Sequence, residues 1–195
     1  DGTHLSVDAS SERTAVRHHT STTWRGCVAA ALALAASRPV AAQSPAAPPP
    51  LPATDITAAD VQKFLQGLPP DAINDLPIRV VDVGSHRVGV YGVFRPKSQP
   101  GDAIAHLTRT TEIYYILKVT GTLVTGGTIA ALKPPPPGRN AGPRGDRIDG
   151  GVSRTVGPGD IIIIPGRTPH WWSSLDGDIN YLIYRSDPDG RMNLK

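Results

Sequence analysis

Apolar residues from about residue 78 onward occur in short runs that glycine, proline and aspartate separate. Runs of this length, rich in valine, isoleucine, threonine and tyrosine, are typical of strands joined by turns. We expect strands at residues 78–83, 86–94, 102–107, 112–119, 122–125, 128–132, 152–156, 160–164, 170–174 and 179–185. Their regular spacing predicts an all-β sandwich or barrel with antiparallel strands.

One segment has helical periodicity instead. Its apolar positions recur at the spacing of a single helix face: Val61, Phe64, Leu65 and Leu68. Thr57 can cap this helix with Asp60 three residues later, and Pro69 ends it, so we expect a helix at residues 58–68. The apolar stripe is narrow, which favours packing against the outside of the barrel or against a partner subunit.

Near the carboxyl end, a run of four isoleucines at residues 161–164 follows the turn residues Gly159 and Asp160. A continuous apolar run bounded by turns predicts a strand that is buried on both faces. Pro165 ends the run, and His170 follows five residues later. We therefore expect His170 at the rim or mouth of the barrel.

A second candidate segment lies upstream, where a short polar stretch separates His106 from Glu112. Beyond residue 42 the only histidines are His86, His106 and His170, and the only glutamate is Glu112. Two of these three histidines and this glutamate therefore lie in the two segments that are candidates for a functional site. We interpret His86 as a hydrogen-bonded rim residue.

Together the two segments resemble the signature motifs of the cupin superfamily, G(X)5HXH(X)3-4E(X)6G and G(X)5PXG(X)2H(X)3N. His106 and Glu112 match the first motif, and Gly159, Pro165 and His170 match the second. A pairing of His106 with the second histidine of the first motif is one residue out of register and stays open.

The chain departs from these motifs at several positions. Thr108 stands in the place of the second histidine, and Val119 in the place of the glycine that closes the first motif. In the second motif, Arg167 replaces a glycine and Ser174 replaces the asparagine. Three of the four family ligands therefore carry over to this chain.

The resemblance implies an antiparallel double-stranded β-helix, or jelly-roll barrel, with the one helix before it. It also implies one divalent metal ion held by His106, Glu112 and His170, a ligand set that suits iron, manganese or zinc. The opposite reading is a cupin that has lost its metal, in which these residues are polar barrel residues.

Four further residues are candidates for binding a small-molecule ligand. Thr108 shares a strand face with His106 if the strand continues that far, and Tyr114 shares a face with Glu112. Trp171 and Trp172 follow His170, so one of them can wall a ligand cavity, and core packing is the alternative role for both.

The leading hypothesis for function is a protein that acts on a small organic molecule, and the resemblance favours oxygenase or isomerase chemistry. Catalytic residues are not identifiable. One alternative is a non-catalytic barrel that holds a sugar or an aromatic acid, and another is a structural oligomer. No G-x-S-x-G motif of a serine hydrolase is present.

The amino-terminal residues suggest export. An alanine-rich apolar run around Cys27 is too short to span a bilayer, and residues 40–42 are a plausible cleavage site before Gln43. We expect a leader with a signal peptide at residues 1–42, an alanine and proline linker at 43–54, and one domain at 55–195 in the periplasm or outside the cell. After cleavage no cysteine would remain, and we expect no membrane attachment.

Charge excludes one class of partner. Twenty lysines and arginines against seventeen acidic residues give a net charge of +3, and the basic residues are scattered. A nucleic-acid surface needs basic residues clustered on one face, so we expect no nucleic-acid partner. The proline-rich residues 133–151 predict a long loop, for which disorder or a contact between two copies in a homodimer is favoured over a substrate lid.

Overall fold

The computed structural model describes residues 49–134 and 142–195. The expected leader, the first residues of the expected linker and part of the long loop lie outside the described residues, so the division into leader, linker and domain stays a prediction. Within the described part, no helix is long and apolar enough to cross a membrane.

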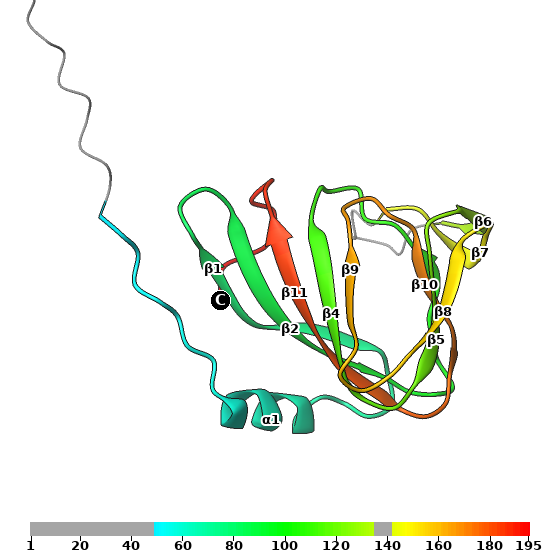
Figure 1. Ribbon diagram of the computed structural model, residues 1–195, viewed down its shortest axis with the longest axis horizontal. Helices are drawn as coiled ribbons and strands as arrows, with labels where there is room; N and C mark the ends of the chain where they lie inside the picture. The colour runs from blue at the N-terminus through cyan, green and yellow to red at the C-terminus, as the bar shows by residue number, and fades with distance from the viewer. Residues whose placement is uncertain (1–48, 135–141) are drawn as a thin grey trace, which may run out of the picture. The chain divides into compact units, whose positions relative to one another are not determined.

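Two antiparallel sheets make up the fold (Figure 1). The first sheet contains, in spatial order, β1 (Asn74–Asp82), β2 (Arg87–Arg95), β11 (Ile179–Asp187), β4 (Thr111–Lys118) and β9 (Ile161–Ile164). The second contains β6 (Thr128–Lys133), β7 (Arg144–Asp149), β3 (Ala103–Ile104), β10 (His170–Leu175), β5 (Gly121–Thr125) and β8 (Val152–Val156).

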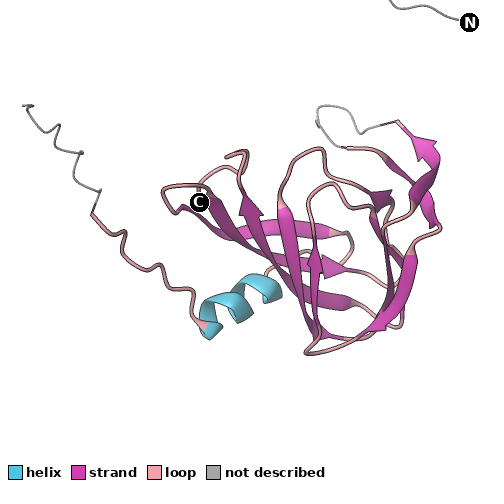
Figure 2. Cartoon of the chain, turned by 45° about the horizontal axis from the view of Figure 1, so that its top comes forward, coloured by secondary structure: helices cyan, strands magenta, loops and turns pink. Residues whose placement is uncertain are grey.

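The chain passes back and forth between these sheets. β4 lies in the first sheet, β5 and β8 in the second, β9 in the first, β10 in the second and β11 in the first. This alternation is the topology of a double-stranded β-helix. The predicted fold class, all-β with one helix, is confirmed (Figure 2).

The main core lies between the sheets. It joins side chains of the first sheet, such as Tyr114, Ile116 and Tyr181, to Leu123 and Trp172 of the second. Burial alternates along β4, so Glu112, Tyr114 and Ile116 share the inner face as predicted. Glu112 therefore enters the barrel on the same face as the core.

The prediction of a strand buried on both faces at the four isoleucines was wrong. Ile162 and Ile164 are 6% and 2% exposed, whereas Ile161 and Ile163 are both 65% exposed. β9 pairs only with β4 at the edge of its sheet, and its outer face is uncovered in the described part of the chain. An apolar run alone does not distinguish this arrangement from a central strand.

In the sequence, Val90 and Phe94 of β2 look core-facing, and this prediction was wrong. Tyr91 and Val93 point into the core, whereas Val90 and Phe94 are only half-buried. The register explains the difference, because core residues of β11 lie opposite these two positions. Ile183 pairs with Tyr91, and Tyr181 pairs with Val93. Aromatic and β-branched residues occupy both faces of β2, so the pattern did not fix which face was inside.

Helix α1 (Ala58–Gln66) ends two residues before the expected limit. The predicted cap is confirmed, because the Thr57 hydroxyl accepts from the Asp60 amide at 3.1 Å and the Asp60 carboxylate accepts from the Thr57 amide at 3.1 Å. The helix packs on β2, where a Cβ atom at Gly92 would come within 2.8 Å of Phe64. The helix therefore lies on the outside of the barrel, which was one of the two predicted placements.

The predicted long loop contains a strand. β7 (Arg144–Asp149) forms a hairpin with β6 and also pairs with β3, so the loop prediction was wrong for these residues. Prolines and glycines around this short strand hid its alternation. The strand matters for the site because it places Arg144 beside Ile104 of β3.

Two residues that replace motif glycines keep a glycine-like backbone. Val119 has φ = 70° and Arg167 has φ = 66°, both in the left-handed region that residues with a side chain rarely adopt. Both turns therefore adopt a left-handed backbone without a glycine, at the cost of local strain.

Candidate metal centre

Three elements bring the candidate ligands together at one end of the barrel. Glu112 is the second residue of β4, and His170 is the first residue of β10 on the opposite sheet. His106 and Thr108 lie in the connection between β3 and β4, because β3 ends at Ile104. The prediction that a strand carries His106 was therefore wrong, although its position in sequence was informative.

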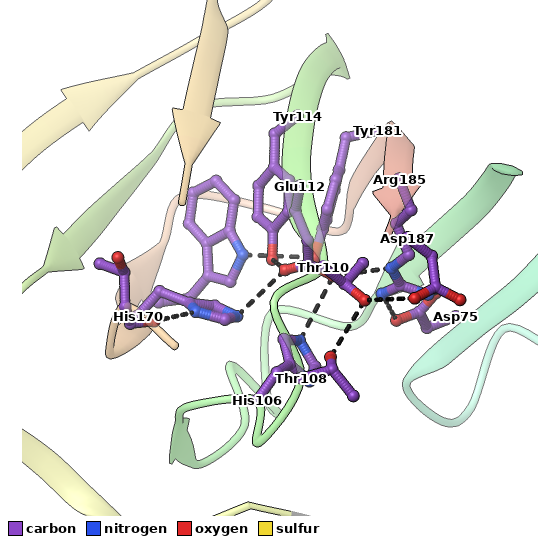
Figure 3. A network of polar contacts seen from close by, with 12 residues as sticks. Asp75, His106, Thr108, Thr110, Glu112, Tyr114, His170, Tyr181, Arg185 and Asp187 are labelled. Atoms are coloured by element: carbon purple, nitrogen blue, oxygen red, sulfur yellow. Dashed lines mark hydrogen bonds and ion pairs between the residues drawn. The ribbon is translucent and has the colours of Figure 1, made fainter. Parts of the chain in front are cut away.

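The two imidazoles approach the two oxygens of a single carboxylate (Figure 3). His106 Nε2 lies 3.3 Å from Glu112 Oε1, and His170 Nε2 lies 3.4 Å from Glu112 Oε2. One ligand atom from each residue can be chosen so that all three lie within 4.8 Å of one another. Glu112 and His170 are buried, and His106 is half-buried.

The tautomer of His170 is fixed by its other nitrogen. Nδ1 lies 2.9 Å from the carbonyl oxygen of Thr168, which can only accept, so Nδ1 carries the hydrogen. Nε2 then carries the free lone pair, and it lies 3.4 Å from Glu112 Oε2. Burial lowers the pKa of His170, and Glu112 and Thr168 oppose this only partly, so the ring stays neutral as a metal ligand must be.

Both Nε2 atoms are buried and, among the described residues, lack a hydrogen-bond partner. Unsatisfied buried polar atoms are rare in native proteins and call for a cause. Adjacent ligand atoms around one ion, each about 2.0–2.2 Å from it, lie about 3.0–3.4 Å apart. The nitrogen to oxygen distances here agree with that spacing, so the donor set fits a divalent metal.

Arg185 is the residue at the site that the sequence did not reveal. Its Nε donates to Glu112 Oε1 at 2.7 Å, and its terminal nitrogens donate to Asp75 at 3.1 and 2.6 Å. Burial opposes ionisation of Glu112, but the charge of Arg185, with help from His106 and His170, lowers the pKa of Glu112 far below its usual value. Glu112 is therefore a carboxylate.

A sequence signal for Arg185 exists in the alternation of β11. Tyr181 and Ile183 point inward, so Arg185 two residues later also points inward, and it pairs with Glu112 across the sheet. An arginine on the apolar face of a strand needs a buried anion as its partner. Glu112 was a candidate for this buried anion.

Two cavities reach the centre from outside. A cavity of about 630 Å³ is lined by His106, Thr108 and several arginines, and a smaller one of about 260 Å³ is lined by His106, Thr108 and Glu112. Both cavities are open depressions at the same end of the barrel. A small molecule entering the smaller one meets the Glu112 carboxylate.

The four residues expected to bind a ligand differ in their surroundings. Thr108 lines both cavities and donates from its hydroxyl to Thr110 at 3.0 Å. The Tyr114 hydroxyl lies 3.4 Å from Glu112 Oε2 in the buried interior. Trp172 belongs to the core between the sheets, and Trp171 packs half-buried against a second apolar cluster. Their ligand-binding roles stay predictions.

His86 lies apart from this cluster. Its Nδ1 is 2.8 Å from the Ser85 hydroxyl in the connection between β1 and β2, and the ring is half-buried. It therefore offers a matched control for the two candidate ligands.

No protein-family model matches the chain, and no curated protein matches it. Solved structures do. A cupin family protein with a double-stranded β-helix fold from Methanocaldococcus jannaschii is 14% identical, over 62% of this chain and 88% of that one, with a TM-score of 0.35. The DMSP lyase DddQ of Ruegeria pomeroyi is 14% identical, over 74% and 79%, with a TM-score of 0.41. The EutQ protein of Clostridium difficile is 14% identical, over 60% and 69%, with a TM-score of 0.36.

Proposed function

From a cupin-type barrel with two histidines and a carboxylate at one end, we propose that this protein binds one divalent metal ion through His106, Glu112 and His170. We propose further that the metal site acts on, or binds, a small organic molecule. The observation that carries the proposal is the pair of buried Nε2 atoms that face the Glu112 carboxylate without a hydrogen-bond partner in the described part of the chain.

Two neutral imidazoles and one carboxylate suit iron, manganese or zinc, and an ion held by three protein ligands supplies a Lewis acid with open coordination positions. The surrounding residues have separate tasks. The Thr168 carbonyl orients His170, and Arg185 keeps Glu112 ionised. The Tyr114 hydroxyl near Glu112 and the Thr108 hydroxyl in both cavities are placed to hydrogen-bond a ligand or water.

Oxygenase or isomerase chemistry is the narrower proposal, and it rests on the resemblance of the two motifs to those of cupins. Export to the periplasm or the outside of the cell is likewise a proposal, which rests on the apolar run and cleavage site before Gln43. A fold of this kind hosts many chemistries, so the substrate must be sought from the site itself.

Titration of the full chain with Co²⁺ tests the metal proposal. Cobalt bound by imidazole nitrogens and a carboxylate gives visible absorption whose intensity reports the coordination number. We expect saturation at one ion per chain in the parent and in His86→Ala, and loss of the bands in His106→Ala and His170→Ala. Equal spectra in the parent and both site variants would refute the ligand assignment.

A second candidate function is a non-catalytic barrel that binds its ligand without metal. The specific observation in its favour is Arg185, which already neutralises Glu112 and lets the centre exist without an ion. Chelation separates the two functions. A ligand bound with the same dissociation constant before and after metal removal, and recovered unchanged, supports the non-catalytic barrel.

A further inference from the structure

Arginine side chains make up most of the charged lining of the larger cavity at the centre. Its lining includes four arginines, Arg109, Arg144, Arg167 and Arg191, and only two carboxylates. Both carboxylates are already engaged: Asp189 accepts from Arg109 at 2.9 and 2.6 Å, and Asp75 accepts from Arg185 at 3.1 and 2.6 Å. Of the remaining three arginines, only Arg144 has a carboxylate within ion-pair distance among the described residues, and this carboxylate belongs to Asp102.

Arg144 is the clearest case. Its guanidinium lies 3.4 Å from Asp102, but that carboxylate also accepts from Lys133 at 2.7 Å. Among the described residues, Arg144 Nε is buried and has no hydrogen-bond partner. A buried donor on a cation that lacks a partner costs free energy, which favours an anion close to this guanidinium.

Arg167 adds a second, independent observation. It occupies a left-handed backbone position where the cupin motif has glycine, and within residues 49–134 and 142–195 its Nε reaches only the Leu107 carbonyl, at 3.4 Å. A strained residue with a long cationic side chain persists where its side chain has a use. The turn that delivers His170 to the metal centre also delivers Arg167 to the cavity wall.

We propose that the ligand of this site is a small organic anion, whose carboxylate or phosphate group is held by Arg144 and Arg167, with Arg191 at the rim. The inference rests on the proposed function of the same site, because it names the class of molecule that the metal centre receives. Planar guanidinium groups bind such anions through paired, charge-assisted hydrogen bonds.

The rest of the lining agrees with an organic body. Ile104, Ala105 and Leu107 give the cavity an apolar part beside the arginines, and its volume of about 630 Å³ suits a molecule of small-metabolite size. His106 lines both cavities. An anion held by the arginines therefore lies next to a candidate metal ligand.

Binding of benzoate and benzamide to the metal-free full chain tests the inference, because the two probes share a shape and differ in charge. After the chelator is dialysed away, NMR titration at low salt follows the arginine Nε signals. We expect benzoate to bind at least about tenfold more tightly than benzamide, the factor that one charge-assisted hydrogen bond supplies. Phenyl phosphate, titrated in parallel, shows which anionic group is preferred.

Variants locate the site. Arg144→Met and Arg167→Gly should each weaken benzoate binding by at least about fivefold. Arg167→Gly removes the guanidinium without loss of fold, because glycine suits the backbone there. Arg147→Met, on the same strand as Arg144 but paired with Asp149 outside the cavity, should bind as the parent does.

Failure of this inference is distinguishable from failure of the metal proposal. A parent that binds Co²⁺ but binds benzoate and benzamide alike overturns the anion site and leaves the metal centre standing. Benzoate affinity within twofold of the parent in both Arg144→Met and Arg167→Gly also overturns it. A parent that prefers benzoate tenfold yet never binds Co²⁺ supports the anion site and contradicts the metal proposal.

Discussion

Replacement of Arg185 by methionine should destabilise the metal-free protein by about 3–4 kcal/mol at pH 7. Arg185 Nε donates to Glu112 at 2.7 Å, and the Glu112 side chain is only 2% exposed. Removal of one partner from a buried ion pair typically costs about 3–5 kcal/mol, because the other charge stays buried without compensation.

Proton uptake by Glu112 limits this cost. Protonation of a glutamate at pH 7 costs about 1.36 kcal/mol for each unit between its ordinary pKa of 4.5 and pH 7. A Glu112 that becomes neutral on folding therefore costs about 3.4 kcal/mol of stability. Asp75, the other partner of Arg185, is 35% exposed and stays solvated after the change. The Arg185 guanidinium also lies over the Tyr91 ring, 4.1 Å from its centroid, and methionine replaces this cation–π contact with packing alone.

Urea unfolding in the presence of a chelator measures the loss. Arg147→Met is the matched control, because Arg147 and Asp149 are 55% and 57% exposed and such surface pairs contribute less than about 1 kcal/mol. Saturating Zn²⁺ should then restore more stability to Arg185→Met than to the parent, since the ion supplies the positive charge that Glu112 has lost. A loss in chelator no larger than that of the control would refute the reasoning.

Three further predictions concern the barrel and its helix. Arg167→Gly should raise the free energy of unfolding by about 0.5–1 kcal/mol, because relief of left-handed strain exceeds the added freedom of the unfolded chain, and thermal unfolding checks this. Ile164→Ala should cost about 2–5 kcal/mol in urea unfolding, whereas Ile163→Ala should cost far less; equal losses would contradict the assigned faces of β9. The hydrogen bonds from Thr57 lower the pKa of Asp60 below 3.8, so the cap stabilises the helix above pH 3.8 and this stability is lost as the pH falls through the folded-state pKa; an NMR titration midpoint of the Asp60 carboxyl at or above 3.8 would contradict it.

The sequence predicted the fold because the signals were local. Turn residues delimited the strands, and the cap at Thr57 marked the start of the helix. The motif glycines that are missing did not mislead the fold assignment, since Val119 and Arg167 keep the left-handed backbone that those glycines would adopt. The segment around β7 was missed because its few alternating residues lie between prolines and glycines.

The centre was only partly predictable, because its energetics depend on pairs far apart in the chain. His106, Glu112 and His170 were identifiable because histidine and glutamate are rare beyond residue 42. The structure brings the three residues together. Arg185 is 73 residues from Glu112, and only the strand register shows that they are neighbours. The same holds for Arg144, whose role at the cavity depends on the pairing of β7 with β3.

Elemental analysis of the full chain, purified without chelator or affinity metal, tests the central claim most directly. The parent and His86→Ala should carry about one equivalent of iron, manganese or zinc, as the ligand set suits, and His106→Ala and His170→Ala should lose it. No metal in the parent, even after reconstitution with each of these ions, would contradict the metal centre.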